Sequence, residues 1–184
     1  MISVFDMFSI GIGPSSSHTV GPMKAAKLFV DALISQQLMP STDNVRCELF
    51  GSLGQTGIGH GTGKAVILGL SGESPEDIPV ESIDSILEEV TLTEKINLNG
   101  NKLVAFPKSN AIVYHRRKTL PAHANAMTLY AYHGEQLLLE QTYYSIGGGF
   151  IVQDCDFEKE KDKALSLHNN IKRPHVFSTA EELL

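Results

Sequence analysis

Cysteine and tryptophan are scarce in this sequence, whose 184 residues include two cysteines, Cys47 and Cys155, and no tryptophan. The two cysteines lie far apart and lack the short spacings with which cysteines bind zinc or hold iron-sulfur clusters. The sequence therefore predicts neither a disulfide framework nor metal ligands within this chain.

Long apolar runs and positive charge are also scarce. No segment approaches the roughly 20 apolar residues that span a bilayer, and the N-terminal MISVFDMF lacks the basic start and apolar stretch of a signal peptide. Fifteen Lys and Arg stand against 21 Asp and Glu, a formal net charge of −6, and the main basic cluster is HRRK at 115–118. We therefore expect a cytoplasmic protein that binds neither nucleic acid nor membrane.

The apolar content of 42% is enough for a real core, and its pattern predicts one α+β domain with a mostly antiparallel sheet and helices packed on it. Apolar residues at three- and four-residue spacing predict helices over 20–38 and 80–90, and an apolar run predicts another over 65–70. Alternating or β-branched runs between turn residues predict the strands: 45–50, 95–106 around an Asn-Gly turn, 110–115, 125–133, 135–146 and 150–154.

The chain changes character near residue 153. The segment 154–184 is charged and patternless until STAEELL at 178–184, which has the composition of a helix start. We expect a folded domain over 1–153, with 154–184 forming a linker and the beginning of a further domain.

A dense cluster of polar side chains precedes the first predicted helix. The stretch GIGPSSSHTVGPM at 11–23 places Ser15, Ser16, Ser17, His18 and Thr19 in succession at the helix start. One serine can cap the helix while the others lie in a turn. Hydroxyls beside unpaired helix N–H groups also suit a carboxylate or phosphate. The imidazole of His18 favours this second interpretation, because capping does not need it.

Three further segments carry candidate site residues. His60 lies between Gly59 and Gly61, where its ring can stand exposed as an acid, a base or a ligand. His123 and Asn125 lie where a loop enters a predicted strand. Two further predicted strands are separated by Gly147, Gly148 and Gly149, which form either a tight bend or a set of amide donors for an anion. Neither a P-loop, a dinucleotide fingerprint nor a nucleophile elbow occurs.

Four motifs in order resemble the bacterial iron-sulfur-dependent L-serine dehydratases, specifically their β domain or β chain: SVFDMFSIGIGPSSSHTVGPM, GSLGQTGIGHGT, LPAHANAM and YYSIGGGFIV. The resemblance covers residues 1–153. It implies a lyase, an L-serine ammonia-lyase of amino-acid catabolism and gluconeogenesis, that converts L-serine to pyruvate and ammonia without pyridoxal phosphate. It also implies a [4Fe-4S] cluster bound by an α domain or α chain that this sequence lacks, so the isolated chain is expected to be inactive, and it implies a homodimer.

The resemblance also implies roles for the residues of the four motifs. Ser15, Ser16, Ser17 and Thr19 would hold the substrate carboxylate, with Thr62, Asn125 and the glycines 147–149 as further binding groups. His18 would add a charge-assisted bond when protonated. His60 is the first candidate for the acid/base residue, and His123 is the second. Gly63 departs from the family pattern, which commonly has aspartate at this position.

Other functions stay open at this point. The domain also resembles the allosteric substrate-binding domain of some D-3-phosphoglycerate dehydrogenases, which would make it a non-catalytic anion-binding regulatory module. A structural dimerisation module is a further alternative. The pair His18 and His60 favours catalysis, because a pure anion receptor would not need both.

Overall fold

The computed structural model describes residues 11–156, and the chain divides into two units, Met1–Asp154 and Cys155–Leu184. Beyond its first three positions, the segment 154–184 lies outside the described residues. Its assignment as a linker and the start of a further domain therefore stays a prediction. Within the described segment, no helix is long and apolar enough to cross a membrane.

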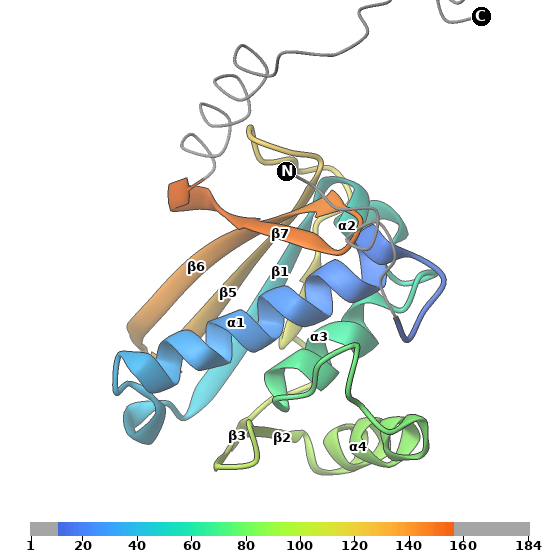
Figure 1. Cartoon of the computed structure of the whole chain (residues 1–184). Coiled ribbons are helices and arrows are strands. Elements are labelled where there is room, and N and C mark those ends of the chain that lie inside the picture. Colours follow the sequence, from blue (N-terminus) through green and yellow to red (C-terminus); the bar gives the residue numbers. More distant parts are fainter. Residues whose placement is uncertain (1–10, 157–184) are drawn as a thin grey trace, which may run out of the picture. The chain divides into compact units, whose positions relative to one another are not determined.

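Seven strands in residues 11–156 form one sheet with the order β2-β3-β1-β5-β6-β7, and β4 pairs with β1 beside this path (Figure 1). The pairs β1–β5, β5–β6, β6–β7 and β2–β3 are antiparallel, whereas β1 runs parallel to β3 and β4. The strands are β1 Asn44–Phe50, β2 Lys95–Leu98, β3 Lys102–Ala105, β4 Ile112–Tyr114, β5 Asn125–His133, β6 Gln136–Gly147 and β7 Phe150–Gln153. The predicted α+β class with a mostly antiparallel sheet is confirmed.

Helix α1 lies across one face of the sheet, where it contacts β5, β6 and β7, and it packs along α3 (Figure 1). The face of the sheet beneath it supplies the core through alternating positions such as Val45, Cys47 and Leu49, all fully buried. In the described segment the helical elements are η2 Ser16–Val20, α1 Gly21–Ser35, η3 Met39–Ser41, α2 Gly51–Thr56, α3 Thr62–Leu70 and α4 Val80–Thr93.

The helices α1, α3 and α4 fall where apolar spacing predicts them, and the Asn-Gly turn joins β2 to β3 with φ of 49° at Asn99 and 69° at Gly100. The glycine-rich segment at 51–63 has a composition typical of a loop, but its first six residues form the helix α2. A Cβ at Gly51 would lie 2.1 Å from the carbonyl oxygen of Ala124, and one at Gly54 would lie 2.4 Å from that of His115. These glycines thus let α2 pack directly on the backbone of a distant loop.

Candidate active site

The polar cluster before α1 forms a π-helical turn, η2, in which the backbone N–H of Gly21 bonds the carbonyl of Ser16. Ser15 caps this turn from an extended conformation, and its Oγ accepts a hydrogen bond from the backbone N–H of His18 at 3.2 Å. Pro22, which has no backbone N–H to donate, lies at the junction where η2 passes into α1. The wide turn directs His18 and Thr19 into the protein, where both are buried.

His18 is held between two serine hydroxyls. Its Nδ1 lies 2.9 Å from Ser17 Oγ and its Nε2 lies 2.9 Å from Ser52 Oγ on α2. The carbonyl of His18 accepts a 2.6 Å hydrogen bond from the buried hydroxyl of Thr62. Burial lowers the pKa of His18 below its ordinary value, and the nearby His60 lowers it further, while a hydrogen bond to Ser52 opposes the shift. The ring therefore favours its neutral form.

His60 packs against His18, with ring centroids 4.8 Å apart and planes tilted by 40°. Its Nδ1 lies 3.0 Å from the backbone carbonyl of Thr56. A carbonyl oxygen can only accept a hydrogen bond, so Nδ1 carries the hydrogen. In the neutral ring, Nε2 then holds the lone pair, and no described residue bonds it. The carbonyl of His60 is in turn held by the hydroxyl of Thr19 at 3.3 Å.

A pocket of about 320 Å³ opens beside His60. It is lined by residues 12–14, by Thr19, by the turn at 58–61 and by Lys64 near the start of α3. Apolar side chains complete the pocket: Ile12, Ile58, Ala65, Leu68 and Ile83. The lone pair of His60 is thus available beside a cavity large enough for a small organic molecule.

Gly63 faces a tyrosine. A Cβ at Gly63 would lie 2.4 Å from the hydroxyl oxygen of Tyr114 on β4. Burial raises the pKa of Tyr114 above its ordinary value, with a smaller effect of Cys47, while a hydrogen bond with the backbone of Gly63 opposes the shift. Tyr114 therefore occupies the space that a side chain at this position would need.

The predicted residue His123 lies in the loop that leads into β5, and Asn125 is the first residue of β5, a strand that contacts α2. The backbone N–H of Asn125 donates to His123 Nδ1 at 3.0 Å, so this nitrogen is unprotonated and Nε2 carries the hydrogen of the neutral ring. The side-chain amide of Asn125 donates to the carbonyl of Ser145 at 3.1 Å. The carbonyl of Ala124 accepts from the backbone N–H of Ser52 at 2.8 Å, which ties this loop to the residue that bonds His18.

Gly147, Gly148 and Gly149 form the bend between β6 and β7, with φ of 99°, 60° and 79°. These angles explain three successive glycines, because other residues are strained in this region. Strand β6 contacts η2, and a Cβ at Gly21 would lie 2.1 Å from the hydroxyl oxygen of Ser145. No hydrogen bond joins the three glycines to the described histidines, so their predicted anion-binding role stays a prediction.

Sequence reasoning did not identify three residues around the two histidines. Ser52 bonds His18 from 34 positions away, Lys64 lines the pocket, and Tyr114 abuts Gly63. Ser52 lies within a glycine-rich segment and Lys64 follows Gly63, and neither position carries a motif that points to a site. Only the place of Lys64 beside His60 in three dimensions distinguishes it.

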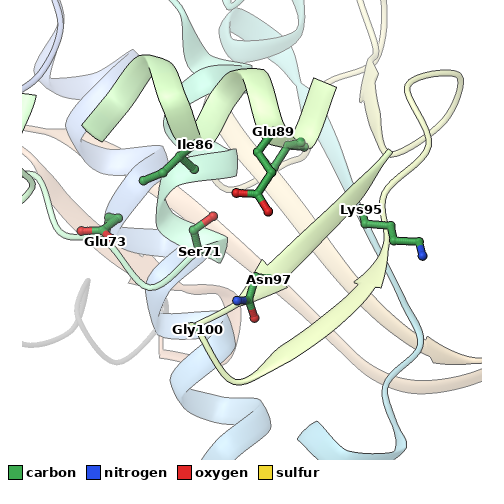
Figure 2. A pocket seen from close by; sticks show the side chains of 8 residues that line it. Ser71, Glu73, Ile86, Glu89, Lys95, Asn97 and Gly100 are labelled. Carbon is green, nitrogen blue, oxygen red and sulfur yellow. The ribbon is translucent and has the colours of Figure 1, made fainter. Parts of the chain in front are cut away.

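A second pocket, of about 160 Å³, lies between α4 and the β2–β3 strands (Figure 2). Glu73, Glu89 and Ser71 are among its lining residues, and Figure 2 shows the amine of Lys95 pointing away from it. It contains none of the residues that the sequence singles out.

The described residues do not fit the ligand set of an iron-sulfur cluster. Among residues 11–156, no group of three or more His, Cys, Asp or Glu is placed to hold a metal ion. Cys47 is fully buried in the core, and burial, with a smaller effect of Glu48, raises the pKa of its thiol, so a metal-binding thiolate is disfavoured.

Comparison with known proteins places this arrangement in a family. The family model described as serine dehydratase beta chain matches residues 3–156. The chain is similar to L-serine dehydratase of Streptomyces coelicolor, with 50% identity over 184 residues that cover 100% of this chain and 40% of the relative. It is similar to L-serine dehydratase 1 of Escherichia coli, with 44% identity over 100% of this chain and 39% of the relative. It is also 35% identical to L-serine dehydratase of Helicobacter pylori, over 99% of this chain and 39% of the relative.

The chain thus spans about two fifths of the length of the curated relatives it matches. The family model covers most of this chain, including η2, both histidines and the β6–β7 bend. The chain belongs to the serine dehydratase beta chain family.

Proposed function

We propose that this chain is the substrate-handling β domain of an L-serine dehydratase, a lyase that converts L-serine to pyruvate and ammonia. The observation that carries the proposal is His60, which lines a pocket and whose Nδ1 is fixed on a carbonyl, while no residue in 11–156 bonds its Nε2. The names of the similar proteins support the reaction and the substrate.

The reaction removes the Cα proton and the Cβ hydroxyl of serine. His60 Nε2 accepts the Cα proton, the C–H electron pair forms the Cα–Cβ double bond, and the Cβ–O bond breaks. The proton taken up by His60 then passes to the departing hydroxyl, which leaves as water, and His60 returns to its neutral form. The resulting enamine tautomerises to an imine, which water hydrolyses to pyruvate and ammonia. His60 suits the first step because its Nδ1–H is already committed to Thr56, which fixes both tautomer and ring orientation.

His18 acts as a positioning residue behind His60. Both of its ring nitrogens are occupied by serine hydroxyls and its side chain is only 9% exposed, so it has no nitrogen left for the substrate. Packing against a ring that favours the neutral state keeps a second positive charge away from His60. This role differs from the direct carboxylate bond that the sequence alone suggests.

His123 is the second candidate for acid/base work, and its tautomer suits donation. Because Nδ1 accepts from Asn125, Nε2–H is the group that can donate to a substrate oxygen. The two histidines therefore present complementary atoms, a lone pair on His60 and a hydrogen on His123. Nε2–H of His123 can thus hydrogen-bond the departing hydroxyl, but it keeps its proton, because a neutral imidazole that lost it would become an imidazolate.

The polar segment before α1 contributes mainly by holding the histidines. Ser15 caps η2, Ser17 bonds His18, and Thr19 and Thr62 bond the carbonyls of His60 and His18. Ser16 is exposed and its hydroxyl has no partner among the described residues, so it is the serine of this segment best able to bond the substrate. Asn125 and the glycines 147–149 remain proposed binding groups.

A partner segment completes the enzyme. The relatives are about two and a half times as long as this chain, and the described residues do not fit a cluster. As part of the same proposal, a [4Fe-4S] cluster, which would supply Lewis-acid chemistry, is held by an α domain outside this chain. Assembly as a cytoplasmic homodimer is part of the same proposal.

The test is anaerobic formation of pyruvate from L-serine by this chain alone and by this chain with the α segment and its cluster reconstituted. Activity in the mixture alone supports the proposal. Absence of activity when the cluster is spectroscopically intact and the two pieces associate would overturn it.

A non-catalytic anion-binding module is the second candidate, and one observation favours it: the ionisable side chains lining the His60 pocket are both basic. In the complete enzyme, the substitution His60→Ala separates the two. Loss of turnover with an unchanged cluster spectrum indicates catalysis, whereas altered saturation by serine with turnover retained indicates regulation.

A further inference from the structure

The pocket beside His60 is lined by basic side chains, although the protein as a whole carries a negative net charge. The chain carries a formal net charge of −6, yet no Asp or Glu is among the described residues that line the pocket. Its ionisable side chains are His60 and Lys64. A cavity lined by basic groups alone attracts anions, and its apolar walls weaken screening by water.

Lys64 is uncommitted, unlike other lysines of the same layer. On α1, Lys24 pairs with Glu76 at 2.6 Å, and Lys27 donates to the carbonyl of Gly72. The ammonium of Lys64 forms neither an ion pair nor a hydrogen bond with any residue in 11–156, and the residue is exposed. A cation at the edge of a pocket with no partner of its own remains available to a ligand.

The substrate carboxylate needs a cationic partner, and His18 is poorly suited to be one. It is buried, and both of its nitrogens contact serine hydroxyls. His60 must be neutral to accept a proton. Lys64 is therefore the pocket residue that can carry a permanent positive charge during the reaction.

We propose that Lys64 is a further substrate-binding residue of the proposed reaction, and that its ammonium holds the α-carboxylate of the amino acid beside His60. This inference rests on the proposed function. An anchored carboxylate orients the adjacent Cα–H bond toward Nε2 of His60. The same ammonium also offsets negative charge that spreads onto the carboxylate as the Cα proton leaves.

Steady-state kinetics of the full-length, cluster-loaded enzyme test the proposal with Lys64→Met, Lys64→Arg and the control Lys95→Met. Lys95 is an exposed lysine on β2, by the second pocket. We expect Lys64→Met to raise KM for L-serine about tenfold or more, the scale of one charge-assisted hydrogen bond, with a smaller fall in kcat. Lys64→Arg should retain most of the affinity, and Lys95→Met should match the parent enzyme.

A binding measurement separates this inference from the proposed function. L-Alanine has the carboxylate but no hydroxyl to eliminate, and L-alaninamide lacks the carboxylate. By calorimetry, Lys64→Met should weaken L-alanine binding by the factor seen in KM and leave L-alaninamide unaffected.

The outcomes are distinct. Pyruvate formation with KM and L-alanine affinity unchanged in Lys64→Met overturns the role of Lys64 and leaves the proposed function standing. Binding of L-alanine that depends on Lys64, in an enzyme that forms no pyruvate, supports the carboxylate site and overturns the dehydratase function. An intact parent enzyme that neither binds L-alanine nor forms pyruvate overturns both.

Discussion

The imidazole rings of His18 and His60 lie 4.8 Å apart between centroids, and their nitrogens face different partners. Both nitrogens of His18 contact serine hydroxyls, whereas Nδ1 of His60 bonds a carbonyl and its Nε2 has no partner in the described part of the chain. One ring is thus structural in its bonding and the other is available for chemistry. This division of roles leads to separate expectations for the two histidines.

Replacing His60 with glutamine should abolish most turnover without unfolding the protein. The amide lacks a basic nitrogen, so kcat for pyruvate formation should fall by a factor of about 10² or more. The change is measured in the full-length enzyme by a coupled assay, with thermal unfolding recorded in parallel. His133→Gln is the matched control, because His133 is exposed on the β5–β6 hairpin and bonds only surface groups. A His60→Gln enzyme with kcat within threefold of the parent would contradict the assignment.

Ser52→Ala should weaken both the fold and the activity. It removes the hydroxyl 2.9 Å from His18 Nε2 and leaves a buried ring nitrogen unpaired. The expected loss in free energy of unfolding is about 1–3 kcal/mol. The value of kcat should fall about tenfold, because the ring of His18 that packs against His60 becomes less well ordered. Urea unfolding and steady-state kinetics measure the two effects. Ser71→Ala is a suitable control, because the hydroxyl of Ser71 bonds only the carbonyl of Ile67 at the end of α3. Equal changes in free energy of unfolding and in kcat for the two variants would refute the role of Ser52.

The stability of the chain should depend on pH through His18. Burial and His60 lower its folded-state pKa below the ordinary 6.5, so the unfolded chain binds this proton more readily than the folded chain. The stabilising contribution is complete above pH 6.5 and is lost as the pH falls through the lower folded pKa. Urea unfolding between pH 7.5 and 5 should therefore show a steeper loss of stability for the parent than for His18→Asn. Parallel curves for the two proteins would count against a perturbed His18.

Periodicity explains why much of the fold could be predicted. Val45, Cys47 and Leu49 alternate along β1 and fill the core, and the apolar spacing of α1 matches the face it buries. The site was only partly predictable. The sequence identifies the hydroxyls before α1 but not their partners, because the contact between His18 and Ser52 joins residues 34 positions apart and leaves no regular spacing.

The tautomers of His60 and His123 were beyond sequence reasoning for a similar reason. Each depends on one backbone group, the carbonyl of Thr56 for His60 and the N–H of Asn125 for His123. Backbone groups are the same at every position of the chain, so only the folded geometry shows which one meets a ring nitrogen. The backbone of the turns that carry the two histidines thus determines which ring nitrogen of each holds the hydrogen.

A side chain at Gly63 should conflict with Tyr114. The Cβ of Gly63→Ala would lie 2.4 Å from the tyrosine hydroxyl, so the ring must shift, and the expected cost in free energy of unfolding is about 1–3 kcal/mol. Removing the hydroxyl with Tyr114→Phe should recover part of this cost in the double variant, although the single Tyr114→Phe change loses the bond to the Gly63 backbone. A double-mutant cycle by urea unfolding measures the coupling between the two positions. A coupling energy near zero would show that Tyr114 is not what excludes a larger residue at position 63. If Tyr114→Phe recovers part of the stability lost in Gly63→Ala, the tyrosine is the reason that this chain has glycine next to Thr62.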